Sequence, residues 1–212
     1  MKVLKFGGTS VGTVESLQIV KQIIEEQLEQ DKLIVVVSAL GGVTTQLVDC
    51  AGQASYGNKT YESTLAELED RHLKVVTQLI GIDSSEKQRA KIIEKFKKLK
   101  DLFQGVYFVK ELSNKVKDAI VSYGEILSSY IIHEYLKSQG ISNRLMDPKK
   151  VIVTDNNFGK ANVDFEATNQ NIVDYFQDAT YPVIVPGFVS GNSKGVTTTL
   201  GRGWMLLKYG PM

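Results

Sequence analysis

The sequence contains very little cysteine or histidine, which limits the chemistry open to it. One cysteine, Cys50, among 212 residues excludes an internal disulfide and a multi-cysteine zinc site. With two histidines, a histidine-based metal site would need carboxylate ligands as well. No apolar run approaches the roughly 20 residues that span a bilayer, and the N-terminal segment lacks the apolar core of a signal peptide. These absences predict a cytoplasmic protein with no membrane partner.

The sequence also lacks an excess of charge of either sign. Lys and Arg number 25 against 24 Asp and Glu, so the net charge is +1. This balance disfavours a broad positive surface for binding nucleic acid. The 4 Pro and 18 Gly argue against disorder or a fibrous repeat, and the 42% hydrophobic content is enough to bury a core. The chain is therefore expected to be globular, with one large domain or two small ones.

Short apolar runs that alternate with helical patterns predict an α/β fold. Residues 3–6 and 33–37 have the pattern of strands covered on both faces, and an amphipathic helix is expected over residues 17–28. Residues 61–140 are predicted to be mostly helical. Such a β-loop-α-β order is typical of a mostly parallel sheet.

Two further features complete the predicted secondary structure. Ser85 and Gln88 have the spacing of a capping box for a helix that runs to about residue 103. Strand patterns return beyond residue 140, over residues 142–146, 151–154, 183–189 and 196–200, with a helix over residues 165–176. Residues 191–195 are predicted to be the turn of a hairpin within an otherwise parallel sheet.

A glycine-rich loop follows the first predicted strand, with the sequence Lys-Phe-Gly-Gly-Thr-Ser over residues 5–10. Ligands bind at this edge of open α/β sheets, and two glycines let main-chain N–H groups approach a phosphate closely. The loop matches neither the dinucleotide fingerprint nor the P-loop, because the required glycine and lysine positions are not met. A tight turn with an exposed Lys5 is the alternative explanation.

The glycine loop is the first of several short motifs along the chain. They are KFGGTSV at residues 5–11, VVSA at 36–39, GVTT at 42–45, SYGE at 122–125, Asp147, TDNNFGKA at 154–161, Gly187-Phe188, and TTTLGRG at 197–203. In this order they resemble the signature of the aspartokinases, which are members of the amino-acid kinase family. The resemblance covers residues 2–203. It implies a three-layer α/β sandwich with a mostly parallel sheet, the carbamate-kinase-like fold of that family.

The resemblance implies an activity as well as a fold. The expected reaction transfers the γ-phosphoryl group of ATP to the side-chain carboxylate of L-aspartate, the first step toward lysine, threonine and methionine. ATP, Mg²⁺ and L-aspartate are the implied cofactors and partners. A carboxylate acceptor is already ionised at neutral pH and needs no general base, which agrees with a sequence that has no obvious catalytic histidine.

The resemblance also assigns roles to individual residues. Lys5 is expected to contact the transferring phosphoryl group and is the implied catalytic residue. The implied ATP and phosphate site consists of Lys5, Phe6, Gly7, Gly8, Thr9 and Ser10. The implied aspartate site consists of Ser38, Thr44, Glu125 and Arg202. In it, Glu125 holds the substrate amino group and Arg202 pairs with a substrate carboxylate, both complementary in charge.

Each of these residues also has an ordinary structural explanation. Glu125 can be an acid in the first turn of a helix, where the helix dipole favours it. Arg202 can be an exposed cation of a hairpin. Ser38 and Thr44 are residue types that are common in loops and at helix N-caps.

The resemblance stops after Gly203, where the family continues with Gly-Ser-Asp and this chain reads WMLLKYGPM. Residues 1–203 are therefore expected to be the N-terminal part of an amino-acid kinase domain, and residues 204–212 a divergent tail. A truncated domain of this kind would lack the adenine site and leave open sheet edges. We expect such a fragment to be inactive and prone to self-association, which allows a homo-oligomer.

Two other functions compete with this interpretation. The chain can belong to another amino-acid kinase with a different acceptor, although the SYGE and Thr44 motifs favour aspartate. It can also be a non-catalytic module that binds aspartate without ATP. An oxidoreductase is disfavoured because the glycine spacing fails the dinucleotide fingerprint.

Overall fold

The main sheet of the protein consists of four parallel strands. The computed structural model describes residues 1–179 and 181–201. In spatial order the strands are β1 (Lys2–Phe6), β2 (Leu33–Val37), β5 (Val183–Pro186) and β3 (Arg144–Leu145). The first two strands confirm the predictions at residues 3–6 and 33–37, whereas β3 is shorter than the predicted strand over residues 142–146.

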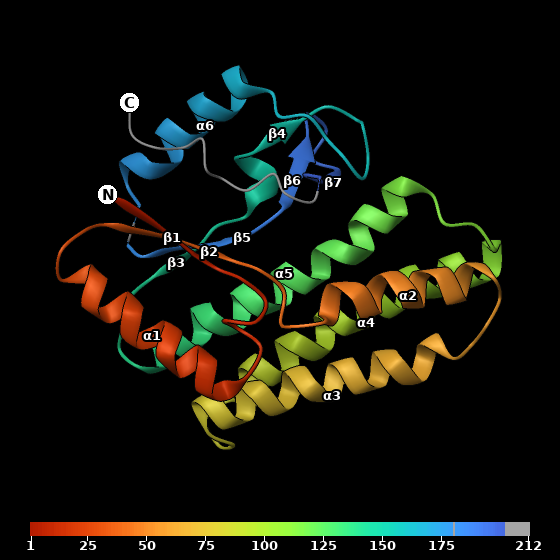
Figure 1. Ribbon diagram of the computed structural model, residues 1–212, viewed down its shortest axis with the longest axis horizontal. Helices are drawn as coiled ribbons and strands as arrows, with labels where there is room; N and C mark the ends of the chain where they lie inside the picture. The colour runs from red at the N-terminus through yellow and green to blue at the C-terminus, as the bar shows by residue number, and fades with distance from the viewer. Residues whose placement is uncertain (180, 202–212) are drawn as a thin grey trace.

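Helices cover both faces of this sheet (Figure 1). On β2, the side chains of Leu33, Val35 and Val37 belong to the large core shared with α1 (Val14–Leu28) and α5 (Asn114–Ser138). The alternate residues Ile34 and Val36 belong to a second cluster with side chains of α6 (Phe165–Gln177). Because successive strand residues point to opposite faces, β2 is apolar throughout. The expected three-layer sandwich with a mostly parallel sheet is confirmed.

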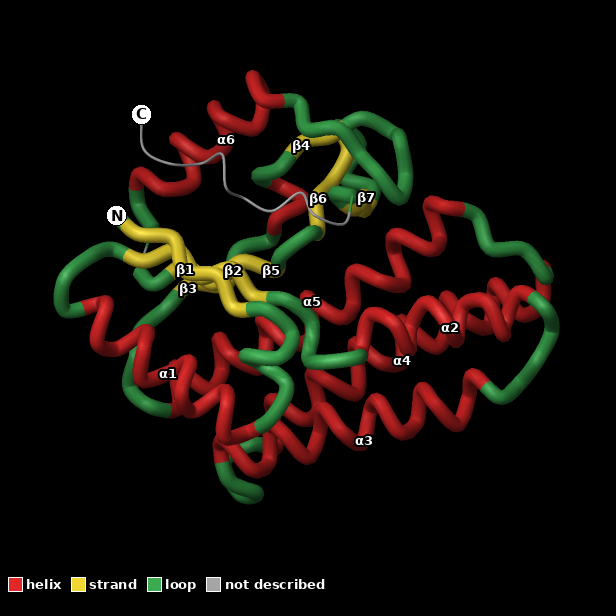
Figure 2. Tube along the Cα trace, in the orientation of Figure 1, coloured by secondary structure: helices red, strands yellow, loops and turns green. Residues whose placement is uncertain are grey.

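The region predicted to be mostly helical forms a bundle beside the sheet (Figure 2). It contains α2 (Val43–Ser55), α3 (Tyr61–Ile80), α4 (Glu86–Val109) and α5. On α4 the buried residues recur every three or four positions, at Ile92, Phe96, Leu99, Phe103 and Val106. No helix within residues 1–179 and 181–201 is long and apolar enough to cross a membrane.

The predicted capping box at the start of α4 is wrong. Ser85 is the N-cap residue, but its hydroxyl donates to the carbonyl oxygen of Ile82 at 3.2 Å instead of capping the helix. The amide of Gln88 donates to a carboxylate oxygen of Glu134 on α5, at 2.9 Å. A tertiary partner has therefore replaced the local contact that the spacing predicts.

A second, three-stranded sheet packs beside the first, in the order β4 (Val153–Thr154), β6 (Val189–Asn192) and β7 (Thr197–Thr199). The hairpin between β6 and β7 is antiparallel, as predicted. The single strand predicted over residues 183–189 is wrong, because β5 and β6 belong to different sheets. Phe188 lies between them with a φ of 65°, a left-handed conformation that ends the strand.

Candidate functional site

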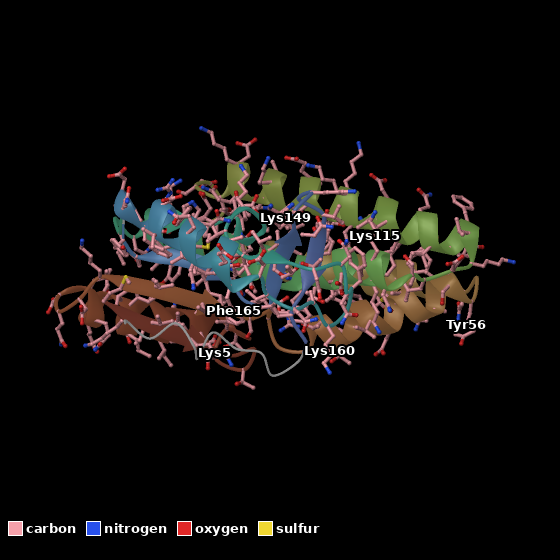
Figure 3. All side chains as sticks on the ribbon, turned by 90° about the horizontal axis from the view of Figure 1, so that it is seen from above. Lys5, Tyr56, Lys115, Lys149, Lys160 and Phe165 are labelled. Carbon is pink, nitrogen blue, oxygen red and sulfur yellow. The ribbon has the colours of Figure 1, made fainter. Side chains whose placement is uncertain are left out.

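Two loops meet at the carboxyl ends of β1 and β2. The glycine loop (residues 7–13) connects β1 to α1, and the second loop (residues 38–42) connects β2 to α2. Lys5, Thr9 and Ser10 are exposed. Figure 3 shows Lys5 on the same side of the molecule as Lys160, which lies in the predicted motif at residues 154–161. Within the described residues, the N–H groups of Gly7, Gly8 and Thr9 donate to no backbone acceptor. They are therefore available to an anion such as a phosphate.

Glycines allow the two loops to approach each other closely. A Cβ added at Gly8 would lie 3.1 Å from the carbonyl oxygen of Ala39, and one at Gly41 would lie 3.2 Å from the carbonyl oxygen of Gly8. At Gly12 the added atom would lie 3.1 Å from the same oxygen of Gly8. At these three glycines the loops therefore meet main chain against main chain, with no room for a side chain.

Helix α5 lies directly against the second loop. A Cβ at Gly124 would lie 2.7 Å from the Cβ of Ala39 and 3.5 Å from Oγ1 of Thr44. One turn further along α5, the hydroxyl of Ser128 donates to the carbonyl oxygen of Ser38 at 2.8 Å. The structure thus brings Ser38, Thr44 and the residues around Gly124 into one small region.

Glu125 is the buried acid of this region, with 6% of its surface exposed. Burial raises the pKa of its carboxyl to about 7 from an ordinary 4.5, although a hydrogen bond from the N–H of Ala39 opposes the rise. The Oε2 atom of Glu125 has no hydrogen-bond partner among the described residues. A buried carboxylate with a free oxygen is costly unless a partner such as an ammonium group arrives.

Most of the predicted site residues lie in or beside the two loops. Lys5 and Phe6 end β1, and Gly7 to Ser10 lie in the glycine loop. Ser38 belongs to the second loop, and Thr44 and Glu125 lie beside it on α2 and α5. Arg202 and the expected tail over residues 204–212 lie outside the described residues. Thr44 is not the N-cap of its helix, because Gly42 takes that position with a φ of 84°.

Two residues that the sequence analysis did not single out have central contacts here. Arg71 on α3 donates to the carbonyl oxygens of Gly41 at 2.9 Å and Gly12 at 3.1 Å. Asp118 on α5 accepts hydrogen bonds from the N–H of Gly159 and from both the N–H and the hydroxyl of Thr199. Neither residue lies in one of the motifs described above. No local pattern could reveal their contacts, because all their partners are distant in sequence.

The described residues contain no cluster of side chains that is typical of a metal site. No group of three or more His, Cys, Asp or Glu side chains in these ranges is arranged to hold one. What the region does offer is an exposed lysine, three free N–H groups and a buried acid. Positive charge and free donors suit a phosphate, and a buried carboxylate suits an ammonium group.

Substitution of Gly124 tests how closely α5 must approach the second loop. We expect Gly124→Ala to lower the free energy of unfolding by about 1–3 kcal/mol, because both colliding atoms are fixed by the backbone. Gly105→Ala on α4 is the matched control, since its Cβ would meet nothing within 4 Å. There we expect a gain of about 0.5–1 kcal/mol from helix propensity. Urea unfolding measures both, and a stabilising Gly124→Ala would contradict the close approach.

Comparison with known families gives the following matches. The profile described as the amino acid kinase family matches residues 1–204. The bifunctional aspartokinase/homoserine dehydrogenase of Buchnera aphidicola subsp. Acyrthosiphon pisum is 31% identical over 206 residues, which cover 95% of this chain and 25% of that protein. Chloroplastic aspartokinase 1 of Arabidopsis thaliana is 30% identical over 210 residues, which cover 95% of this chain and 36% of that protein.

Solved structures match over the same region. The crystal structure of E. coli aspartokinase III in complex with aspartate and ADP has a TM-score of 0.81 and 27% identity, over 95% of this chain and 43% of that one. The structure of the same enzyme with lysine and aspartate has a TM-score of 0.82 and 26% identity, over 95% and 44%. The chain thus spans less than half of these proteins. Its expected resemblance to the aspartokinases is confirmed.

Proposed function

The chain belongs to the amino acid kinase family, and from that premise we propose that it supplies the aspartate-binding and phosphate-contacting part of an aspartate kinase. The observation that carries this proposal is Glu125, a buried acid beside the contact between the two loops, with one oxygen that has no partner among the described residues. The relatives named as aspartokinases, and the solved structure that holds aspartate and ADP, support the choice of aspartate as acceptor.

In this proposal the aspartate site forms around the second loop and α5. The ammonium group of L-aspartate would give the free oxygen of Glu125 the partner it lacks, and Ser38 and Thr44 would contact the substrate from the adjoining loop. Arg202 would pair with a carboxylate of the substrate. The side-chain carboxylate of aspartate attacks as an anion, so no residue has to remove a proton from it.

The phosphate side of the site forms on the glycine loop. Free N–H groups of Gly7, Gly8 and Thr9 fit the oxygens of an ATP phosphate, and exposed Lys5 would neutralise charge on the transferring group. Phe6 and Ser10 flank these groups. The described residues hold no group of three or more His, Cys, Asp or Glu side chains for a metal ion, and Mg²⁺ would bind through phosphate oxygens of ATP. Residues 1–203 would form this part of the kinase domain, and residues 204–212 a tail outside it.

Calorimetric titration of the chain with L-aspartate and with Mg-ATP tests the proposal. We expect saturable binding of L-aspartate, and we expect Lys5→Met to weaken Mg-ATP binding at least tenfold while aspartate affinity stays within about threefold. Lys2→Met is the matched control, since Lys2 is an exposed lysine on the same strand, and we expect no change in either affinity.

The outcomes of this titration separate the competing functions. Absence of aspartate binding would contradict the proposal. Aspartate binding together with no binding of Mg-ATP or of inorganic triphosphate would favour a non-catalytic aspartate-binding module, because triphosphate needs the glycine loop but not the adenine site. Preference for a different carboxylate or a carbamate over aspartate would favour another member of the family.

A further inference from the structure

The guanidinium group of Arg71 joins the two loops of the site. Its Nη1 donates to the carbonyl oxygen of Gly41 at 2.9 Å, and its Nη2 donates to the carbonyl oxygen of Gly12 at 3.1 Å. One carbonyl belongs to the second loop and the other to the glycine loop. The side chain comes from α3, which carries none of the proposed ligand contacts, and it is partly buried.

Within the described residues, few directional contacts other than those of Arg71 join the two loops. Between them, within the described residues, the backbone exchanges the hydrogen bond from the N–H of Ser38 to the carbonyl oxygen of Phe6, and this bond lies at the strand ends. Beyond that point the contact is glycine against main chain, through Gly8, Gly12 and Gly41.

Val11 of the glycine loop and Ala39 and Leu40 of the second loop are also buried in one apolar cluster. Apolar packing draws the loops together but is not directional, so directional bonds such as those of Arg71 are needed to fix how one loop sits against the other.

Planar geometry makes arginine suited to this task. The two nitrogens of one rigid guanidinium reach two acceptors at once, so the positions of the two carbonyl oxygens are set relative to each other. A lysine at the same position has a single ammonium on a flexible stem, and it would fix that relation less well.

On the basis of the proposed function, we infer that Arg71 is a positioning residue that sets the glycine loop against the second loop, and thereby the phosphate donor against aspartate. Group transfer requires the reacting atoms to be held within a fraction of an ångström, and a misplacement of about 1 Å can cost about 100-fold in rate. Arg71 touches neither ligand in this account and acts through the two carbonyl groups that it holds.

The test compares Arg71→Met and Arg71→Lys in the full chain by hydrogen exchange and calorimetry. For Arg71→Met we expect faster amide exchange confined to the two loops, residues 7–13 and 38–42. We also expect about tenfold weaker binding of L-aspartate, since the N–H of Ala39 that contacts Glu125 lies in the displaced loop. Arg71→Lys, which keeps one donor group, is expected to recover part of both effects. Arg89→Met replaces another half-buried helix arginine, outside both loops, and should change neither.

The outcomes distinguish this inference from the function on which it rests. Faster loop exchange with wild-type aspartate affinity in both Arg71 variants would overturn the inference, because Arg71 would then only stabilise the fold. Failure of the wild-type chain to bind aspartate would contradict the proposed function, and the inference with it. If Arg71→Met does not fold, Arg71→Lys decides, and wild-type exchange and affinity in that variant would also count against the inference.

Discussion

Glu125→Gln is expected to weaken binding of L-aspartate by at least about 100-fold at pH 8 while making the protein more stable. The loss of affinity follows from removing the buried charge that would pair with the substrate ammonium group, an effect typically worth 2–5 kcal/mol, and about 3 kcal/mol here. Calorimetric titration measures the affinity. A decrease of less than about threefold would show that the carboxylate is not part of the aspartate site.

The gain in stability follows from the sign of the pKa change. Burial raises the pKa of the Glu125 carboxyl to about 7 from an ordinary 4.5, so the folded protein holds a proton that the unfolded chain has released between those values. Stability is therefore lost as the pH rises from 4.5 to 7, and the cost reaches about 3 kcal/mol above that window. A glutamine carries no charge and avoids this cost.

Unfolding in urea at two pH values separates this effect from a general change in packing. We expect Glu125→Gln to raise the free energy of unfolding by about 1–3 kcal/mol at pH 8 and to leave it nearly unchanged at pH 4.5. Glu26→Gln, at an exposed position on α1, should change neither stability nor affinity. A variant that is less stable than the wild type at pH 8 would show that the carboxylate stabilises the fold rather than awaiting a ligand.

The same pKa predicts how aspartate binding depends on pH in the wild-type chain. An ammonium group binds the ionised form of Glu125, so affinity should fall as the pH drops below about 7. Binding near pH 7 should also release a proton, and this is visible as a binding heat that varies with the ionisation enthalpy of the buffer. Neither signal should remain in Glu125→Gln.

Local signals explain which parts of the fold could be predicted. The apolar runs over residues 3–6 and 33–37 and the glycines that follow the first run lie close together in the sequence, so strand, loop and helix could all be read from short segments. The capping box failed because Gln88 found a partner 46 residues away. The predicted strand over residues 183–189 failed because its apolar pattern does not reveal the left-handed conformation of Phe188.

The residues of the candidate site also divide into those that local motifs predict and those whose role depends on distant contacts. The motifs predicted Lys5, the glycine loop, Ser38, Thr44 and Glu125 as site residues. In the structure, the last three lie in or around the second loop. Motifs could not find Arg71, whose two partners lie 30 and 59 residues away. They also could not show that Glu125 is buried with an oxygen that no described residue contacts, because that depends on how α5 packs against a loop about 80 residues earlier in the chain.

Asp118→Ala is expected to lower the free energy of unfolding by about 3–5 kcal/mol, the largest loss of stability that we predict. The carboxylate is 1% exposed and accepts bonds from the N–H of Gly159 at 2.9 Å, the N–H of Thr199 at 3.0 Å and the hydroxyl of Thr199 at 2.6 Å. Alanine would leave the buried donors of Thr199 without partners, which costs more than the bonds themselves contribute.

Asp118 also connects the second sheet to the face of α5 that carries Glu125, because residues seven apart on a helix lie on the same side, two turns apart. Asp118→Ala should therefore increase hydrogen exchange in β7 and around Gly159 more than in β1 and β2. Asp118→Asn keeps one acceptor oxygen and should cost about half as much. Asp164→Ala, which removes the exposed N-cap of α6, is the control and should cost about 1 kcal/mol. If Asp118→Ala costs no more than this control, β7 is held against α5 by packing alone, and the buried carboxylate has no such connecting role.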